Sequence, residues 1–63
     1  MDNEHRVVSL CFAGRRYWQE DFVGSLYECR RFVALRAKHG RHTATTHITR
    51  RSFDDWKRLN PAE

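Results

Sequence analysis

Apolar residues at helical spacing predict the main helix of this chain, from Leu26 to His39. Ser25 before it and Glu28 three residues later form a Ser-x-x-Glu capping box, in which each side chain accepts from a backbone amide at the helix start. Gly40 follows the helix, where the left-handed conformation that closes many helices favours glycine. The sequence therefore predicts the start, the body and the end of one helix.

The faces of this helix differ in character. An apolar stripe, widened at one edge by Phe32, predicts the side that packs on the core, and it consists of Leu26, Cys29, Val33 and Ala37. A second face consists of Tyr27, Arg30, Arg31, Ala34 and Lys38. Leu35 lies nearly opposite the stripe, either as an isolated exposed residue or as one contact of a homodimer or partner surface.

Before the helix, period-two alternation of apolar and β-branched residues predicts a strand over residues 7–12 and a return strand over residues 16–23. A tight turn joins them into a hairpin. Two registers stay open, because a two-residue loop sets Tyr17 opposite the end of the first strand, whereas a three-residue loop sets Trp18 opposite Leu10.

After the helix, alternating threonines predict a third strand over residues 43–50, with inward candidates Ala44, Thr46 and Ile48. Ser52 then repeats the capping pattern for a short helix that ends at Asn60-Pro61, with Phe53, Trp56 and Leu59 on one side. The order β-β-α-β-α predicts one α+β domain. We expect a three-stranded, mainly antiparallel sheet, the main helix on one face, and the short helix at the remaining edge of the core.

Length and composition restrict the class of protein. The chain has 63 residues, enough for a single domain whose first five residues are expected to fray. No apolar run approaches the ~18 residues that span a bilayer, and no signal-peptide core is present, which predicts a cytoplasmic protein without membrane contact. Without a secretory signal, Cys11 and Cys29 are expected to be reduced thiols.

Positive charge is concentrated in one region of the chain. The formal net charge is +4, and residues 26–51 hold seven basic residues against Glu28 alone. Most of the basic residues are arginine, whose planar guanidinium suits phosphate and carboxylate groups. These residues predict a surface for nucleic acid or an acidic protein, with a solvated helix face as the alternative. Its members are Tyr27, Arg30, Arg31, Lys38, Arg41, Arg50 and Arg51.

Two further groups of residues have a structural explanation as well as a functional one. Trp18 and Leu35 are candidate anchors of a protein interface, although both tryptophans also suit a core. A zinc site would draw on Cys11, Cys29, His39, His42 and His47. Their spacing departs from the short ligand pairs of structural zinc, so no metal or cofactor is expected.

A catalytic pair would need His42 or His47 beside Asp54 or Asp55, as in a small nuclease. The two aspartates are explained as first-turn residues that the helix dipole favours. Adjacent carboxylates at residues 20 and 21 point to opposite faces of a strand and form no dyad. The sequence therefore predicts a non-enzymatic protein.

The order of parts resembles small accessory proteins of lambda-like phages. The similarity covers residues 6–50 and lies in the hairpin from Arg6-Val7, the Gly24-Ser25-Leu26 start, the basic helix ending in Lys38-His39-Gly40, and the threonine-rich strand. Several such proteins bind host proteins or nucleic-acid machinery, so the resemblance implies a small regulatory binding protein. The hairpin and helix also resemble arm-type DNA-binding domains of phage integrases, whose three-stranded sheet reads DNA; here only two strands precede the helix.

Overall fold

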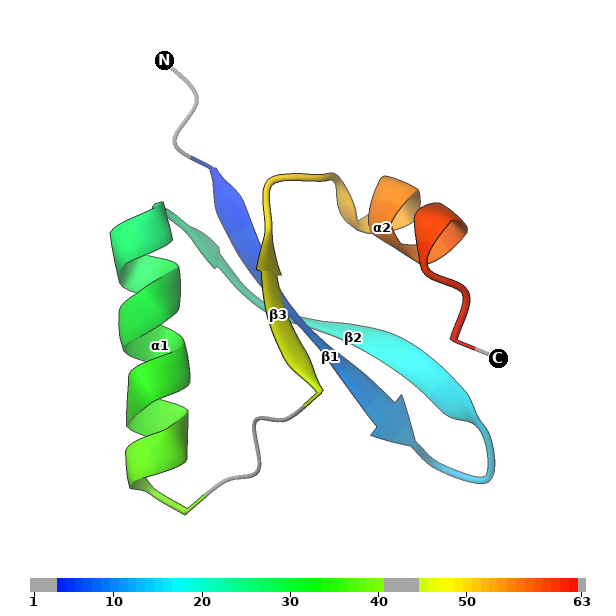
Figure 1. Ribbon diagram of the computed structural model, residues 1–63, viewed down its shortest axis with the longest axis horizontal. Helices are drawn as coiled ribbons and strands as arrows, with labels where there is room; N and C mark the ends of the chain where they lie inside the picture. Colours follow the sequence, from blue (N-terminus) through cyan, green and yellow to red (C-terminus); the bar gives the residue numbers. More distant parts are fainter. Residues whose placement is uncertain (1–3, 41–44, 63) are drawn as a thin grey trace.

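The computed structural model describes residues 4–40 and 45–62, which form three strands and two helices (Figure 1). The elements in chain order are β1 (His5–Phe12), β2 (Arg16–Gly24), α1 (Leu26–Lys38), β3 (Thr46–Thr49) and α2 (Phe53–Leu59). The sheet packs on α1, so the predicted α+β class and the β-β-α-β-α order are confirmed.

The sheet has the order β2-β1-β3, and both neighbours of β1 run antiparallel to it. The hairpin has the three-residue loop, which sets Leu10 opposite Trp18. Gly14 takes a φ of 78° in that loop, a conformation that favours glycine. β3 is shorter than predicted, although a backbone hydrogen bond from Leu10 to Thr45 extends its ladder. Residues 43 and 44 of the predicted strand lie outside the described residues.

A β-bulge in β2 changes which side chains face α1. Val7 pairs with Phe22 but Val8 pairs with Glu20, so Asp21 is an extra residue in β2. Asp21 and Phe22 therefore both reach α1, where Asp21 contacts the helix through Arg36 and Phe22 stacks on Phe32. Regular alternation would have turned one of these two neighbours to the other face.

α1 begins with the predicted capping box. The Glu28 amide donates to the Ser25 hydroxyl at 3.1 Å, and the Ser25 amide donates to the Glu28 carboxylate at 3.0 Å. At the other end α1 finishes at Lys38, one residue before the predicted end at His39, which is the cap residue. Gly40 follows the cap with a φ of 80°, the left-handed conformation predicted for it. Both ends of the helix thus follow from local sequence.

The core is small. Among the described apolar side chains, those fully shielded from solvent are Val7, Val8 and Cys29. The predicted stripe on α1 was partly wrong, because Leu26 and Ala37 at its edge are exposed. Arg36 occupies a core-facing position instead, since it lies two turns from Cys29 and finds a carboxylate across the sheet.

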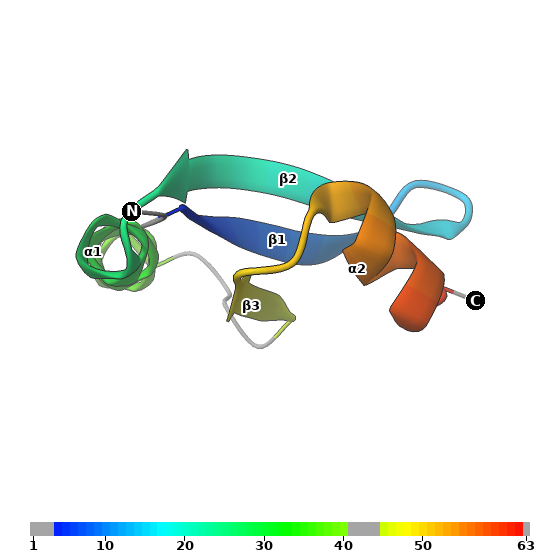
Figure 2. The same cartoon turned by 90° about the horizontal axis from the view of Figure 1, so that it is seen from above.

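α2 lies across the sheet from α1, as Figure 2 shows. Its Trp56 ring meets the edge of Trp18 with centroids 5.3 Å apart, and the Trp18 indole N–H donates to the Asn60 carbonyl at 2.6 Å. The sequence predicted that this helix would close a remaining edge of the core with Trp56, and the structure places Trp56 against Trp18 on the face of the sheet away from α1. Trp18 and its partner Leu10 point to the far face, and α2 follows them there.

Candidate nucleic-acid interface

The outer face of α1 is defined here by Tyr27, Arg31, Ala34 and Lys38, with Arg30 beside it. The three spacings of four, three and four residues place the four side chains of this face within about 60° of one another around the helix axis. All five residues are exposed, and Tyr27 is 68% exposed. The structure therefore brings together the helical members of the predicted binding surface.

The cations of this outer face have no anionic partner among the described residues. Five of the six described carboxylates are held in ion pairs: Glu4 and Glu20 with Arg6, Asp21 with Arg36, Asp54 with Lys57 and Asp55 with Arg58. The sixth, Glu28, accepts from the helix cap. Because the acidic groups are engaged elsewhere, the positive charge of Arg30, Arg31 and Lys38 is left to face solvent.

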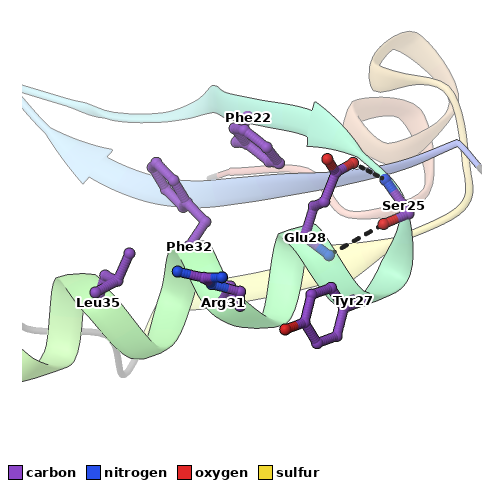
Figure 3. Close-up of a pocket in the computed structure, with 7 residues that line it drawn as sticks. All are labelled: Phe22, Ser25, Tyr27, Glu28, Arg31, Phe32 and Leu35. Carbon is purple, nitrogen blue, oxygen red and sulfur yellow. Dashed lines mark hydrogen bonds between the residues drawn. The ribbon is translucent and has the colours of Figure 1, made fainter.

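Figure 3 shows how this face meets the rest of the helix. Phe22 and Phe32 stack with centroids 5.0 Å apart on the β2 side, while Tyr27 points away from the strand (Figure 3). An open groove of about 620 Å³ runs between these sides and is lined by Phe22, Ser25, Tyr27, Glu28, Arg31, Phe32 and Leu35. Leu35, the predicted interface contact, is 45% exposed within it.

Arg36 is the basic residue of α1 that belongs to the interior. Its guanidinium lies 3.1 Å from both the Asp21 carboxylate and the Ser9 hydroxyl, and 4.8 Å from the centre of the Phe32 ring. Ser9 also donates to Asp21, and Gln19 donates to it at 2.6 Å. This polar cluster separates Arg36 from the outer face, so that residue is not available to a partner.

Two opposing effects act on the pKa of Asp21. Burial of the carboxylate raises its pKa, but hydrogen bonds from Ser9, Gln19 and Arg36, with the charge of Arg36, outweigh burial and lower the pKa below its ordinary value. Asp21 is therefore ionised at neutral pH. Its negative charge neutralises the positive charge of Arg36 inside the protein.

Arg50 and Arg51 lie apart from the outer face of α1. They lie on the connection from β3 to α2, which leads away from α1 at the end of the sheet nearest the N-terminal end of that helix, and they line a shallow hollow with the start of α2 (Figure 1). Asp55 lines the same hollow; its pKa is lowered by the hydrogen bond and charge of Arg58, and by Arg51. Arg41 lies outside the described residues. Among the residues that the structure describes, the cations of the predicted surface thus form two separate groups.

On the far face of the sheet, Trp18 packs into a cluster with Trp56 and His47. In this position Trp18 holds α2 against the sheet, through its contact with the Trp56 ring and its hydrogen bond to the Asn60 carbonyl. The His47 ring packs against these indoles, and Asp54 and Asp55 form ion pairs within α2. The candidate catalytic pair of His47 with either aspartate is not formed, and His42 lies outside the described residues.

The cysteines are free thiols in this structure. Burial raises the pKa of the Cys29 thiol, which disfavours the reactive thiolate. Over residues 4–40 and 45–62, no three His, Cys, Asp or Glu side chains gather closely enough to hold a metal ion.

Comparisons add no relative to this picture. No protein family matches the chain, and neither a curated protein nor a solved structure is significantly similar to it. The resemblance to phage accessory proteins therefore stays a prediction. Neither helix in the described part of the chain is long and apolar enough to cross a membrane.

Proposed function

We propose that this protein is a non-enzymatic nucleic-acid-binding protein and that the outer face of α1 is its contact surface. The observation that supports the proposal is the distribution of charge. The described carboxylates are engaged in ion pairs or, for Glu28, in the helix cap. In contrast, Arg30, Arg31 and Lys38 stand exposed on one helix and reach no described carboxylate within ion-pair distance. Such cations neutralise phosphates and release condensed counterions on binding.

Binding at low salt by fluorescence anisotropy tests this function. The Arg30→Ala/Arg31→Ala variant is expected to lose about tenfold in affinity, because two phosphate contacts are removed. The Lys57→Ala/Arg58→Ala variant is the matched control, since it removes the same charge from side chains that are already in ion pairs. Equal losses in both variants, or no complex with any nucleic acid, would contradict the proposal.

A second candidate is a regulator that docks on another protein, and the groove beside α1 favours it. The groove joins exposed Leu35 to the stacked Phe22 and Phe32 rings. Apolar anchors inside a polar rim are typical of protein interfaces. Leu35→Asp is expected to abolish capture of a defined protein partner, whereas Leu59→Asp, at a comparably exposed leucine on α2, is expected to retain it.

A further inference from the structure

The shape of the molecule at α1 distinguishes between classes of nucleic acid. The Cα atoms extend 35 × 30 × 12 Å, so the molecule is a slab. α1 runs along one end of this slab, and α2 lies toward the other end (Figures 1 and 2). The outer face of α1 is therefore a convex ridge.

We infer that the preferred ligand is duplex DNA, with the outer face of α1 lying in the major groove; this inference rests on the proposed function. The major groove of B-form DNA is about 12 Å wide and admits an α-helix. From Tyr27 to Lys38 the face is about 16 Å long, at ~1.5 Å per residue. Cations stand along this length, where they reach both phosphates and base edges.

Ala34 supports this mode of binding. It lies in the middle of the outer face and is exposed, with Arg31 one turn before it and Lys38 one turn after it. A small side chain there lets the helix backbone approach the floor of the groove, while the longer flanking side chains extend to the bases and the sugar-phosphate backbone. A ridge with a bulky residue at its centre would stand off from the bases.

Other nucleic acids fit this surface less well. Proteins that bind single strands use a positively charged groove with several stacking rings. The groove beside α1 is lined by Arg31 as its single cation and by the Glu28 carboxylate, and its Phe22 and Phe32 rings stack on each other. The cations of α1 stand instead along the convex ridge, with Tyr27 as its aromatic residue. Duplex RNA has a deep and narrow major groove that excludes a helix. The sheet offers no basic platform either, because α1 covers one face, and the other carries α2 and the ion pair of Arg6 with Glu20.

The test compares three probes of one sequence at low salt: a DNA duplex, its single strand and the RNA duplex. We expect the DNA duplex to bind at least about tenfold more tightly than either other probe. Ala34→Leu is expected to weaken duplex binding about tenfold and to leave single-strand binding unchanged, because the added side chain fills the approach to the groove floor. Ala37→Leu, at an exposed alanine to the side of the outer face, is the matched control and should bind as the parent does.

The outcomes separate the two proposals. Equal or tighter binding of the single strand or of duplex RNA, or equal effects of Ala34→Leu and Ala37→Leu, would overturn the major-groove inference while the proposed function stands. No binding of any of the three probes would overturn the proposed function itself. Circular dichroism of each variant confirms that α1 is intact.

Discussion

Single residues decide which cations of α1 form ion pairs and which face solvent. Arg36 is half-buried beside Asp21, whose side chain is 4% exposed, whereas Arg31 five residues earlier faces solvent. The sequence could not predict this difference, because it depends on an unpaired extra residue in β2 that regular alternation does not foresee. The signal available was Arg36 itself, a cation at a core-facing helical position, which requires a buried acceptor.

Replacing Asp21 tests the polar cluster. Asp21→Asn is expected to lower the free energy of unfolding by about 2 kcal/mol, because a half-buried guanidinium loses its anionic partner. Glu20→Gln is the matched control, because this carboxylate is more exposed, at 33%, and Arg6 keeps Glu4 as a second anionic partner. Its loss should cost less than about 1 kcal/mol. Urea unfolding at pH 7 measures both. Similar losses for the two variants would contradict a special role for Asp21.

The same carboxylate makes stability depend on acid. The pKa of Asp21 is lower in the folded chain than its ordinary value, so its contribution is fully present above about pH 4 and is lost as the pH falls through the folded-state pKa. The stability difference between the parent and Asp21→Asn should therefore be constant from about pH 5 to pH 8 and shrink below about pH 4. Urea titrations across this range measure it; a difference that grows on acidification would contradict the pKa direction.

At the scale of elements, local sequence predicted more than tertiary position. Local capping residues set three of the helix ends, and a sequence displays such residues directly. The Ser25–Glu28 box begins α1, Gly40 follows its end, and Ser52 begins α2. The sequence left open which face of the sheet α2 covers, because that depends on hairpin register. A three-residue loop turns Trp18 away from α1, and only then does Trp56 have a partner on the far face.

Gly24 connects β2 to the cap of α1, and its substitution tests that junction. A Cβ there would lie 2.8 Å from the Glu28 carboxylate and 2.9 Å from the Phe22 ring. Gly24→Ala is expected to destabilise the fold by about 1 kcal/mol, because it displaces the capping carboxylate. The same substitution made in a Glu28→Ala background should cost at most about half as much, by urea unfolding; an undiminished cost would show that the cap is not involved.

Loss of the Trp56 ring is expected to detach α2 from the sheet without unfolding the rest of the protein. Trp56→Ala removes the ring that packs on Trp18 and His47, whereas Leu59→Ala changes a side chain that is 50% exposed. Trypsin should cut Trp56→Ala near Lys57 and Arg58 roughly tenfold faster than the parent, since local opening exposes the short helix. The far-ultraviolet signal of α1 should persist. A cleavage rate equal to that of Leu59→Ala would contradict this expectation.

At the scale of the whole molecule, the sequence showed an excess of basic residues but not how the fold distributes them between surface and interior. The α1 cations were expected to form one basic surface with Arg41, Arg50 and Arg51, yet the structure separates Arg50 and Arg51 from the outer face of α1. Arg36, which was not among the predicted members, pairs with Asp21 in the interior. This distribution of basic residues depends on contacts between residues far apart in the chain. Three cations on one ridge remain as the candidate phosphate contacts.

Salt dependence measures how many of those cations act. With three phosphate contacts, the logarithm of the binding constant for duplex DNA should fall against the logarithm of salt concentration with a slope of about −3. Lys38→Ala should reduce the magnitude of that slope by about 1, whereas Lys57→Ala, whose ammonium already pairs with Asp54, should not change it. A slope near zero, or equal slopes for the parent and Lys38→Ala, would argue against phosphate contacts at this face.

The bulge at Asp21 also bears on self-association. β2 is an outer strand of the sheet, and a long regular outer strand is a template on which further chains add and grow into fibrils. The extra residue breaks the spacing of donors and acceptors along β2, so an incoming strand cannot pair with its whole length. The irregularity that buries one carboxylate therefore also protects this small sheet against aggregation when many copies are crowded together.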